Sequence, residues 1–258
     1  MIDVVFKNAD FMVVNKPADL NFHSEVDELT GFDFKAETEA SAERLGQKAG
    51  QEVEHKKVQK TAPGLVVLVK QQQGLEELYP VHRLDKMTSG LVVFALNKAT
   101  AQAFQRMFES HQIQKFYLAI ADKKPKKKQG WIIGDMQSAR RGSWKLAKSK
   151  EHPAKTQFLS FFIEPGLRLY LVKPITGKTH QIRVALKSIG APILGDKRYA
   201  EANKAKQMDR GYLHAFAIQF EFNDQLYQFV QVPDSGEAFL KPNCQSLIQT
   251  WQTPWALF

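Results

Sequence analysis

The sequence predicts an α+β fold, and three observations support this prediction. Apolar runs at residues 130–136, 156–164 and 167–174 follow one another at intervals that suit an antiparallel sheet. Two other segments, at about 98–111 and 179–188, have the pattern of helices. With 258 residues and 43% hydrophobic content, the chain can also bury a sizeable core.

The N-terminal part predicts two short strands and then a polar segment. Residues 2–15 hold two apolar runs around a polar turn, and Pro17 ends the second run. Residues 24–61 are rich in Glu, Lys, Gln and Ala, so we interpret them as a helical excursion from the body. Residues 65–70 (LVVLVK) form either a buried strand or the start of a helix, and their length does not decide between the two.

Two further strands are expected on either side of the first helix. Residues 91–96 (LVVFAL) form one, and residues 115–122 (KFYLAIAD) form the other. No internal repeat is visible in the sequence. We therefore predict one domain over residues 1–233, with an extension over residues 234–258 that packs on its body.

The charge balance indicates a polyanionic partner. Lys and Arg number 36 against 27 Asp and Glu, so the formal net charge is +9, which suits nucleic acid or a lipid surface. Cys244 is the single cysteine, which excludes an internal disulfide and a cysteine-based zinc site and favours a reducing compartment. No apolar run is long enough to span a bilayer. We expect a cytoplasmic protein that does not insert into a membrane.

The segment 81–90 (VHRLDKMTSG) places the carboxylate of Asp85 between two basic residues, in a polar loop that leads into a strand. Asp, Thr and Ser commonly bond their own backbone in turns, so a purely structural role is one interpretation. The positive charges of Arg83 and Lys86 would also keep the carboxylate ionised and available as a nucleophile or base. The segment alone leaves both interpretations open.

The segment 174–185 (PITGKTHQIRVA) concentrates polar and basic side chains, namely Lys178, His180, Gln181 and Arg183. Such a cluster suits phosphate and ribose contacts, and Arg183 can hold a carboxylate through parallel hydrogen bonds. The alternative is a solvated basic helix end. No second His or Cys lies at ligand spacing around His180, so we expect no metal site here.

Taken together, HRLDKMTSG and TGKTHQIRV resemble the RluA-type family of RNA pseudouridine synthases. Further pieces resemble that family in the same order, from about Val13 to Phe220: VVNKPADLNFH, KFYLAI, ILGDKRYA and LHA. The chain departs from the family pattern at Lys178, where Arg is more usual, and at Ala185, where His often follows RV. Residues 24–61 are also longer than the corresponding family segment.

The resemblance implies a pseudouridine synthase catalytic fold, with a mixed, largely antiparallel central sheet, flanking helices and an RNA cleft across the sheet. It implies three catalytic residues. Asp85 attacks the nucleoside or removes a sugar proton, Tyr117 lies against the uracil ring, and Arg183 pairs with Asp85. From its strand alone, Tyr117 would be an ordinary core residue. No cofactor and no metal is implied.

The resemblance also implies residues that bind the RNA. Arg83 fills the space that the flipped base leaves, Leu213 packs below the uracil, and Lys16 belongs to a motif that shapes the cleft wall. Four further positions are expected to contact the RNA: Lys178, His180, Arg140 and Arg141. For the last two, near Trp144, a solvated hairpin face is an equal alternative. Because the chain begins almost at this domain, we expect no S4-type module.

The expected partner is ribosomal or transfer RNA, bound by a monomer without an obligate protein partner. One alternative is an RNA-binding or RNA-chaperone protein that has lost catalysis, but the presence of Asp85, Tyr117 and Arg183 argues against it. Another alternative, a glycosidic hydrolase, requires a second acid near the first. The motifs offer none, because Asp196 and Glu164 lie in segments with structural explanations.

Overall fold

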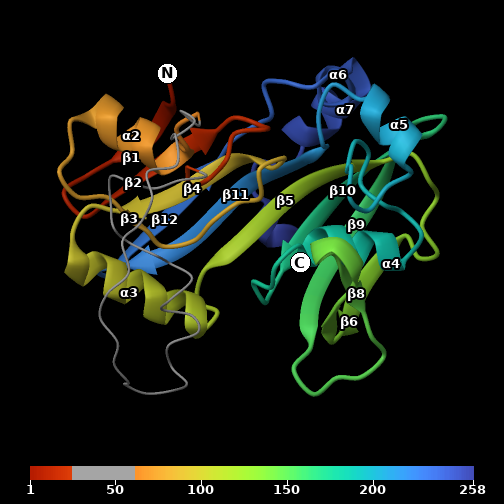
Figure 1. The fold of residues 1–258 in the computed structure, drawn as a ribbon, viewed down its shortest axis with the longest axis horizontal. Helices are drawn as coiled ribbons and strands as arrows, with labels where there is room; N and C mark the ends of the chain where they lie inside the picture. The colour runs from red at the N-terminus through yellow and green to blue at the C-terminus, as the bar shows by residue number, and fades with distance from the viewer. Residues whose placement is uncertain (25–61) are drawn as a thin grey trace, which may run out of the picture.

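The computed structural model describes residues 1–24 and 62–258 (Figure 1). Apart from Ser24, the helical excursion expected over residues 24–61 lies outside the described residues. None of the described helices is both long and apolar enough to cross a membrane.

A ten-stranded sheet forms the centre of the described fold, in the order β1-β2-β4-β11-β5-β10-β9-β6, with β12 paired to β11 and β3 paired to β4. Its strands are β1 (Asp3–Lys7), β2 (Phe11–Lys16), β3 (Tyr79–Pro80), β4 (Ser89–Ala95), β5 (Gln114–Ala121), β6 (Gln129–Gly134), β9 (Ala154–Glu164), β10 (Leu167–Pro174), β11 (Leu213–Phe222) and β12 (Gln225–Val230). The β4–β11 pair is parallel, whereas the other pairs of this sheet are antiparallel. The expected mixed, largely antiparallel sheet is therefore confirmed.

Helices and a small hairpin surround this sheet. The helices are α2 (Leu65–Gln73), α3 (Lys98–Glu109), α4 (Gln181–Ser188), α5 (Ala202–Gln207), α6 (Glu237–Leu240) and α7 (Pro242–Gln249), with the 3-10 turns η1 (Arg140–Gly142) and η2 (Pro254–Leu257). The hairpin consists of β7 (Met136–Ser138) and β8 (Trp144–Leu146), which are joined through η1. Helix α4 contacts β8, β9 and β10 (Figure 1).

The apolar run of β2 is buried on both faces because each face packs against a different helix. Met12 and Val14 belong to the cluster that contains the α2 residues Leu65, Val66 and Val69. Phe11 and Val13 point to the other face, in the cluster that contains the α3 residues Phe104 and Met107. Alternate side chains of a strand point to opposite faces, so a continuous apolar run marks a strand covered on both sides.

Residues 65–70, whose sequence allows a strand or a helix, lie in α2. The helix begins after Gly64 and ends at Gly74, which has the left-handed φ of 61°. This backbone conformation is common at helix ends and favours glycine. Leu65, Val66 and Val69 are its buried side chains, and their spacing fits one face of a helix.

Residues 234–258 contact the body of the domain through aromatic side chains. The rings of Trp251 and Phe161 have centroids 4.9 Å apart. Phe258 lies against Phe116 of β5 with a centroid distance of 5.8 Å. These contacts pack the end of the chain against β9 and β5.

Strands β4 and β11 pair briefly and then separate. Ser89 and Gly90 pair with His214 and Ala215, and further along β11 the partner is β12. Gly90 has a φ of 105°, and a Cβ atom there would lie 2.3 Å from the Ala215 carbonyl oxygen, so only glycine fits. The loop before β4 therefore ends where β4 pairs with β11.

Hydrogen bonds of the buried His214 side chain hold this junction together. Its titration makes the free energy of unfolding depend on pH. The Nδ1 atom of His214 lies 2.7 Å from Ser89 Oγ, and Nε2 lies 2.7 Å from the carbonyl oxygen of Gln231. Arg210 Nη2 also donates to Ser89 Oγ, so the serine hydroxyl is free to donate to Nδ1, and Nε2–H donates to the carbonyl. Burial lowers the pKa of His214 from 6.5 to about 4.

We expect the free energy of unfolding to fall as the pH drops from 6.5 to 4. Between these pH values His214 binds a proton in the unfolded chain but not in the folded protein. At full extent this difference lowers the free energy of unfolding by about 3 kcal/mol. Urea unfolding at several pH values measures the effect. His214→Gln, which cannot titrate, should show a smaller loss over this window than the wild type. Equal slopes for the two proteins would contradict this assignment.

Candidate active site

Lys16 holds the loop that carries Asp85 through hydrogen bonds to backbone carbonyl oxygens. The Lys16 ammonium donates to the carbonyl oxygens of Pro17, Lys86 and Thr88 at 3.0, 3.0 and 2.8 Å. Its side chain is fully buried, and burial lowers its pKa to about 7. The grouping of Lys16 with RNA-contacting residues therefore needs correction, because a buried ammonium cannot reach an RNA directly. Lys16 shapes the loop that forms the cleft wall.

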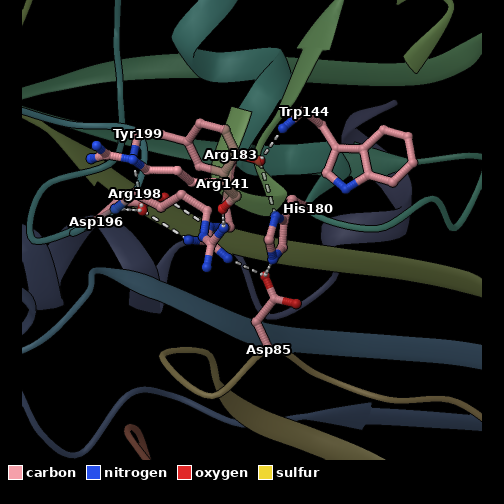
Figure 2. A network of polar contacts seen from close by, with 8 residues as sticks. All are labelled: Asp85, Arg141, Trp144, His180, Arg183, Asp196, Arg198 and Tyr199. Carbon is pink, nitrogen blue, oxygen red and sulfur yellow. Dashed lines mark hydrogen bonds and ion pairs between the residues drawn. The ribbon is translucent and has the colours of Figure 1, made fainter. Parts of the chain in front are cut away.

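The carboxylate of Asp85 contacts an arginine from another element and not the backbone of its own turn. Arg183 of α4 donates from Nη1 to Asp85 Oδ2 at 2.8 Å (Figure 2). The turn is closed by main-chain atoms, since Thr88 N donates to the carbonyl oxygen of Asp85 at 3.0 Å. The expected pairing of these two side chains is thus present in the geometry.

Arg183 also binds a second carboxylate, which the sequence did not place in the site. Its Nε and Nη2 atoms donate to the two oxygens of Asp196 at 2.7 and 2.8 Å. Asp196 is fully buried and accepts further hydrogen bonds from the backbone N–H groups of Arg198 and Tyr199. Burial opposes the charge of Arg183, but the hydrogen bonds and charges of Asp196 and Asp85 outweigh it and raise the pKa of the guanidinium.

This geometry rules against a hydrolase that uses Asp196 as a second acid. Both Asp196 oxygens are occupied by Arg183, and the side chain has no solvent exposure. A general acid must reach the bond that it protonates. Asp196 instead positions Arg183, and the only sequence signal for this role is an Asp in the turn that follows Gly195.

His180 lies beside the carboxylate and is oriented by Tyr199. Its Nε2 atom is 3.9 Å from Asp85 Oδ2, and its Nδ1 atom is 2.9 Å from the Tyr199 hydroxyl. This hydroxyl accepts from the backbone N–H of Trp144 at 2.9 Å, so its own proton is free for Nδ1 (Figure 2). The Nε2–H of neutral His180 then points toward Asp85. Burial, the largest influence, lowers the pKa of His180.

The same network ties the β7–β8 hairpin to the site. Trp144 at the start of β8 bonds Tyr199, and Arg198 Nη1 donates to the carbonyl oxygen of Arg141 at 2.5 Å. Arg140 and Arg141 are exposed and line a cavity of about 920 Å³ that also contains Asp85. The structure therefore brings these two arginines to the cavity that contains Asp85.

A second cavity, of about 450 Å³, lies on the other side of Asp85. It is lined by most of the expected site residues, namely Arg83, Asp85, Tyr117, Lys178, His180, Arg183 and Leu213. Arg83, Asp85, His180 and Arg183 line both cavities, so Asp85 lies between them. Burial raises the pKa of Tyr117, and the charge of Asp85 raises it further. The smaller cavity has the size of a small-molecule site.

Within residues 1–24 and 62–258, no group of three or more His, Cys, Asp or Glu side chains is arranged to hold a metal ion. The reactive group at this site is the carboxylate of Asp85, and its partner is the guanidinium of Arg183.

Comparison with known proteins gives a consistent result. The family model described as RNA pseudouridylate synthase matches residues 10–188. The chain is 40% identical over 252 residues to an uncharacterized RNA pseudouridine synthase of Haemophilus influenzae, a match that covers 98% of this chain and 96% of that protein. It is 34% identical to the dual-specificity RNA pseudouridine synthase RluA of Salmonella typhimurium, over 58% of this chain and 69% of the relative.

Solved structures show the same fold. Human RNA Pseudouridylate Synthase Domain Containing 1 superposes with a TM-score of 0.66 at 21% identity, covering 98% of this chain and 95% of that one. Human RNA Pseudouridylate Synthase Domain Containing 4 gives a TM-score of 0.63 at 22% identity, covering 95% and 93%.

Proposed function

Since this chain belongs to the RNA pseudouridylate synthase family and is an isomerase that acts on RNA, we propose that Asp85 is its catalytic carboxylate. The observation that carries the proposal is the position of Asp85 at the wall of a nucleotide-sized cavity, with one oxygen held by Arg183. Its other oxygen, Oδ1, has no hydrogen-bond partner among the described residues. Figure 2 shows this oxygen pointing away from the guanidinium.

The cavity residues suit a uridine that has left the base stack. Flipping a base costs a few kcal/mol, which contacts in the pocket must recover. Tyr117 and Leu213 provide ring and apolar surfaces in this cavity, and exposed Arg83 lies at the border where it can occupy the space left by the base. Asp85 then attacks the nucleoside or removes a sugar proton, and the freed uracil turns and rejoins through C5. Both routes fit a carboxylate that Arg183 holds through one oxygen and leaves accessible through the other.

The larger cavity suits the RNA backbone. Arg83, Arg140, Arg141, Lys197 and Arg198 line it, and their side chains are exposed. Such a concentration of positive charge attracts phosphates and makes binding salt-dependent. Lys178 and His180 extend the polar lining into the smaller cavity.

We further propose that the target is ribosomal or transfer RNA, modified by a monomer in the cytoplasm. The net charge of +9 and the two cationic cavities support a structured RNA substrate. An RNA-binding protein without catalysis is the weaker candidate, because it would have no need of an ionised carboxylate with a reactive oxygen in a nucleotide-sized cavity.

A transcriptome-wide comparison of pseudouridine in cells with and without the gene tests this function. We expect at least one uridine of ribosomal or transfer RNA to lose its modification in the deletion strain. Expression of the wild-type protein should restore the site, whereas Asp85→Asn at equal protein level should not. Unchanged pseudouridine at every position would contradict the proposed function.

A further inference from the structure

We propose that Lys115 forms a binding site for a backbone phosphate next to the target uridine. The proposal rests on the proposed function, because it assigns one end of the same nucleotide whose base and ribose lie at Tyr117 and Asp85. It adds a phosphate contact inside the smaller cavity, separate from Arg140, Arg141 and Arg198, which line only the larger one.

Lys115 and Tyr117 project from β5 into the same cavity. They are two residues apart on one strand, so their side chains point to the same face, and their Cα atoms are separated by roughly 6.5 Å. Both residues line the cavity that contains Asp85. This separation is comparable with the distance between the base and the phosphate of one nucleotide.

The ammonium of Lys115 is enclosed by the cavity wall. It lies 5.1 Å from the centroid of the Phe108 ring in α3, and 3.9 Å from the place that a Cβ atom on Gly177 would occupy. It therefore sits between the end of α3 and the turn that precedes α4. The side chain is partly buried, and burial lowers the pKa of Lys115.

Among the described residues, the side chain of Lys115 forms no ion pair and no hydrogen bond. Its ammonium makes a cation–π contact with the Phe108 ring. Neither carboxylate on the cavity wall forms an ion pair with it: Asp85 pairs with Arg183, and Glu109 accepts a hydrogen bond from Gln105. A half-buried cation without an anion is costly, and an anion that enters the cavity removes this cost.

A phosphodiester oxygen is the anion that an RNA substrate brings into this cavity. Lysine acts as a compact point charge with three donors, which suits a phosphate approached from several directions. Lys178 is the second lysine of the cavity wall, but its ammonium already donates to the carbonyl oxygen of His152. Lys178 thus has one of its three donors engaged, whereas Lys115 keeps all three free among the described residues.

The test compares Lys115→Met with Lys98→Met, a matched loss of one charge at an exposed position of α3 outside the cleft. The probe is RNA purified from cells that lack the gene, used for pseudouridine formation and for binding at several salt concentrations. We expect Lys115→Met to raise KM about tenfold or more and to reduce the slope of log affinity against log salt by about one phosphate contact. Lys98→Met should leave KM close to the wild-type value.

Thermal unfolding distinguishes a phosphate contact from a structural role. If Lys115 only packs on Phe108, Lys115→Met should lower the melting temperature and leave KM and the salt slope unchanged, which would overturn the proposal. We expect instead an unchanged or higher melting temperature, because an unpaired cation has been removed. Lys115→Arg should recover part of the KM.

The proposed function and the phosphate site fail in different ways. Absence of pseudouridine formation by the wild type on every RNA would refute the function, and the phosphate site with it. Normal wild-type turnover, together with a wild-type KM and salt slope for Lys115→Met, would refute the phosphate site alone.

Discussion

Asp85→Asn is expected to reduce pseudouridine formation by roughly 10⁴-fold or more, the scale of loss seen when a catalytic nucleophile is removed. Asparagine keeps the shape of the side chain but removes the charge that both proposed routes require. RNA affinity should stay within about threefold of the wild type, because the cationic residues of both cavities remain. Single-turnover assays and binding measurements on the same preparation check both expectations.

The matched control is Glu76→Gln, which removes an exposed carboxylate that lines neither of the two cavities beside Asp85. It should retain wild-type turnover. Mass spectrometry of the Asn variant must exclude deamidated protein, which would restore the aspartate. Substantial turnover by a preparation free of Asp would sink the assignment of Asp85, and an equal loss of RNA binding would point to a role in binding.

Arg183→Met is expected to damage both stability and turnover, because Arg183 serves two carboxylates. Loss of the guanidinium leaves Asp196, which is fully buried, without its cation, at a cost of about 3–5 kcal/mol in the free energy of unfolding. It also leaves Asp85 without the partner that holds one of its oxygens in place. The single-turnover rate should therefore fall.

The two effects of Arg183 can be separated with a second substitution. Arg183→Met combined with Asp196→Asn removes the buried charge and should recover part of the stability, but not the turnover, since Asp85 still lacks its cation. Arg183→Lys keeps the charge without the planar fork, so its rate should fall between those of the wild type and Met. Urea unfolding and single-turnover rates measure these effects. Equal rates in all variants would show that Arg183 does not act through Asp85.

The sequence by itself determined the secondary structure wherever the apolar pattern has one clear period. The runs that became β9 and β10 are rich in aromatic and branched apolar residues and are separated by the turn residues Pro165 and Gly166. The helix expected near residues 98–111 is capped by Asn97, whose side chain accepts from the backbone N–H of Thr100. Residues 65–70 have no such clear period, and their helical state was decided by packing of α2 on the sheet.

The sequence also identified the residues of the candidate site, because the segments around Asp85 and Arg183 resemble a known family in residue type and order. It did not give the contacts of these residues. Lys16 looked like an RNA-contacting lysine, yet its ammonium is buried and bonded to three carbonyl oxygens of the chain. A charged side chain has the same letter in the sequence whether it is solvated or enclosed.

Only the tertiary structure decided which charges meet. The turn after Gly195 brings Asp196 under Arg183, and α4 brings Arg183 to Asp85, which lies far away in the sequence. The fold likewise places Lys115 in the cavity of Asp85 without an anionic partner among the described residues. Periodicity reports which face of an element is buried, whereas ion pairing depends on distances between elements that no local pattern contains.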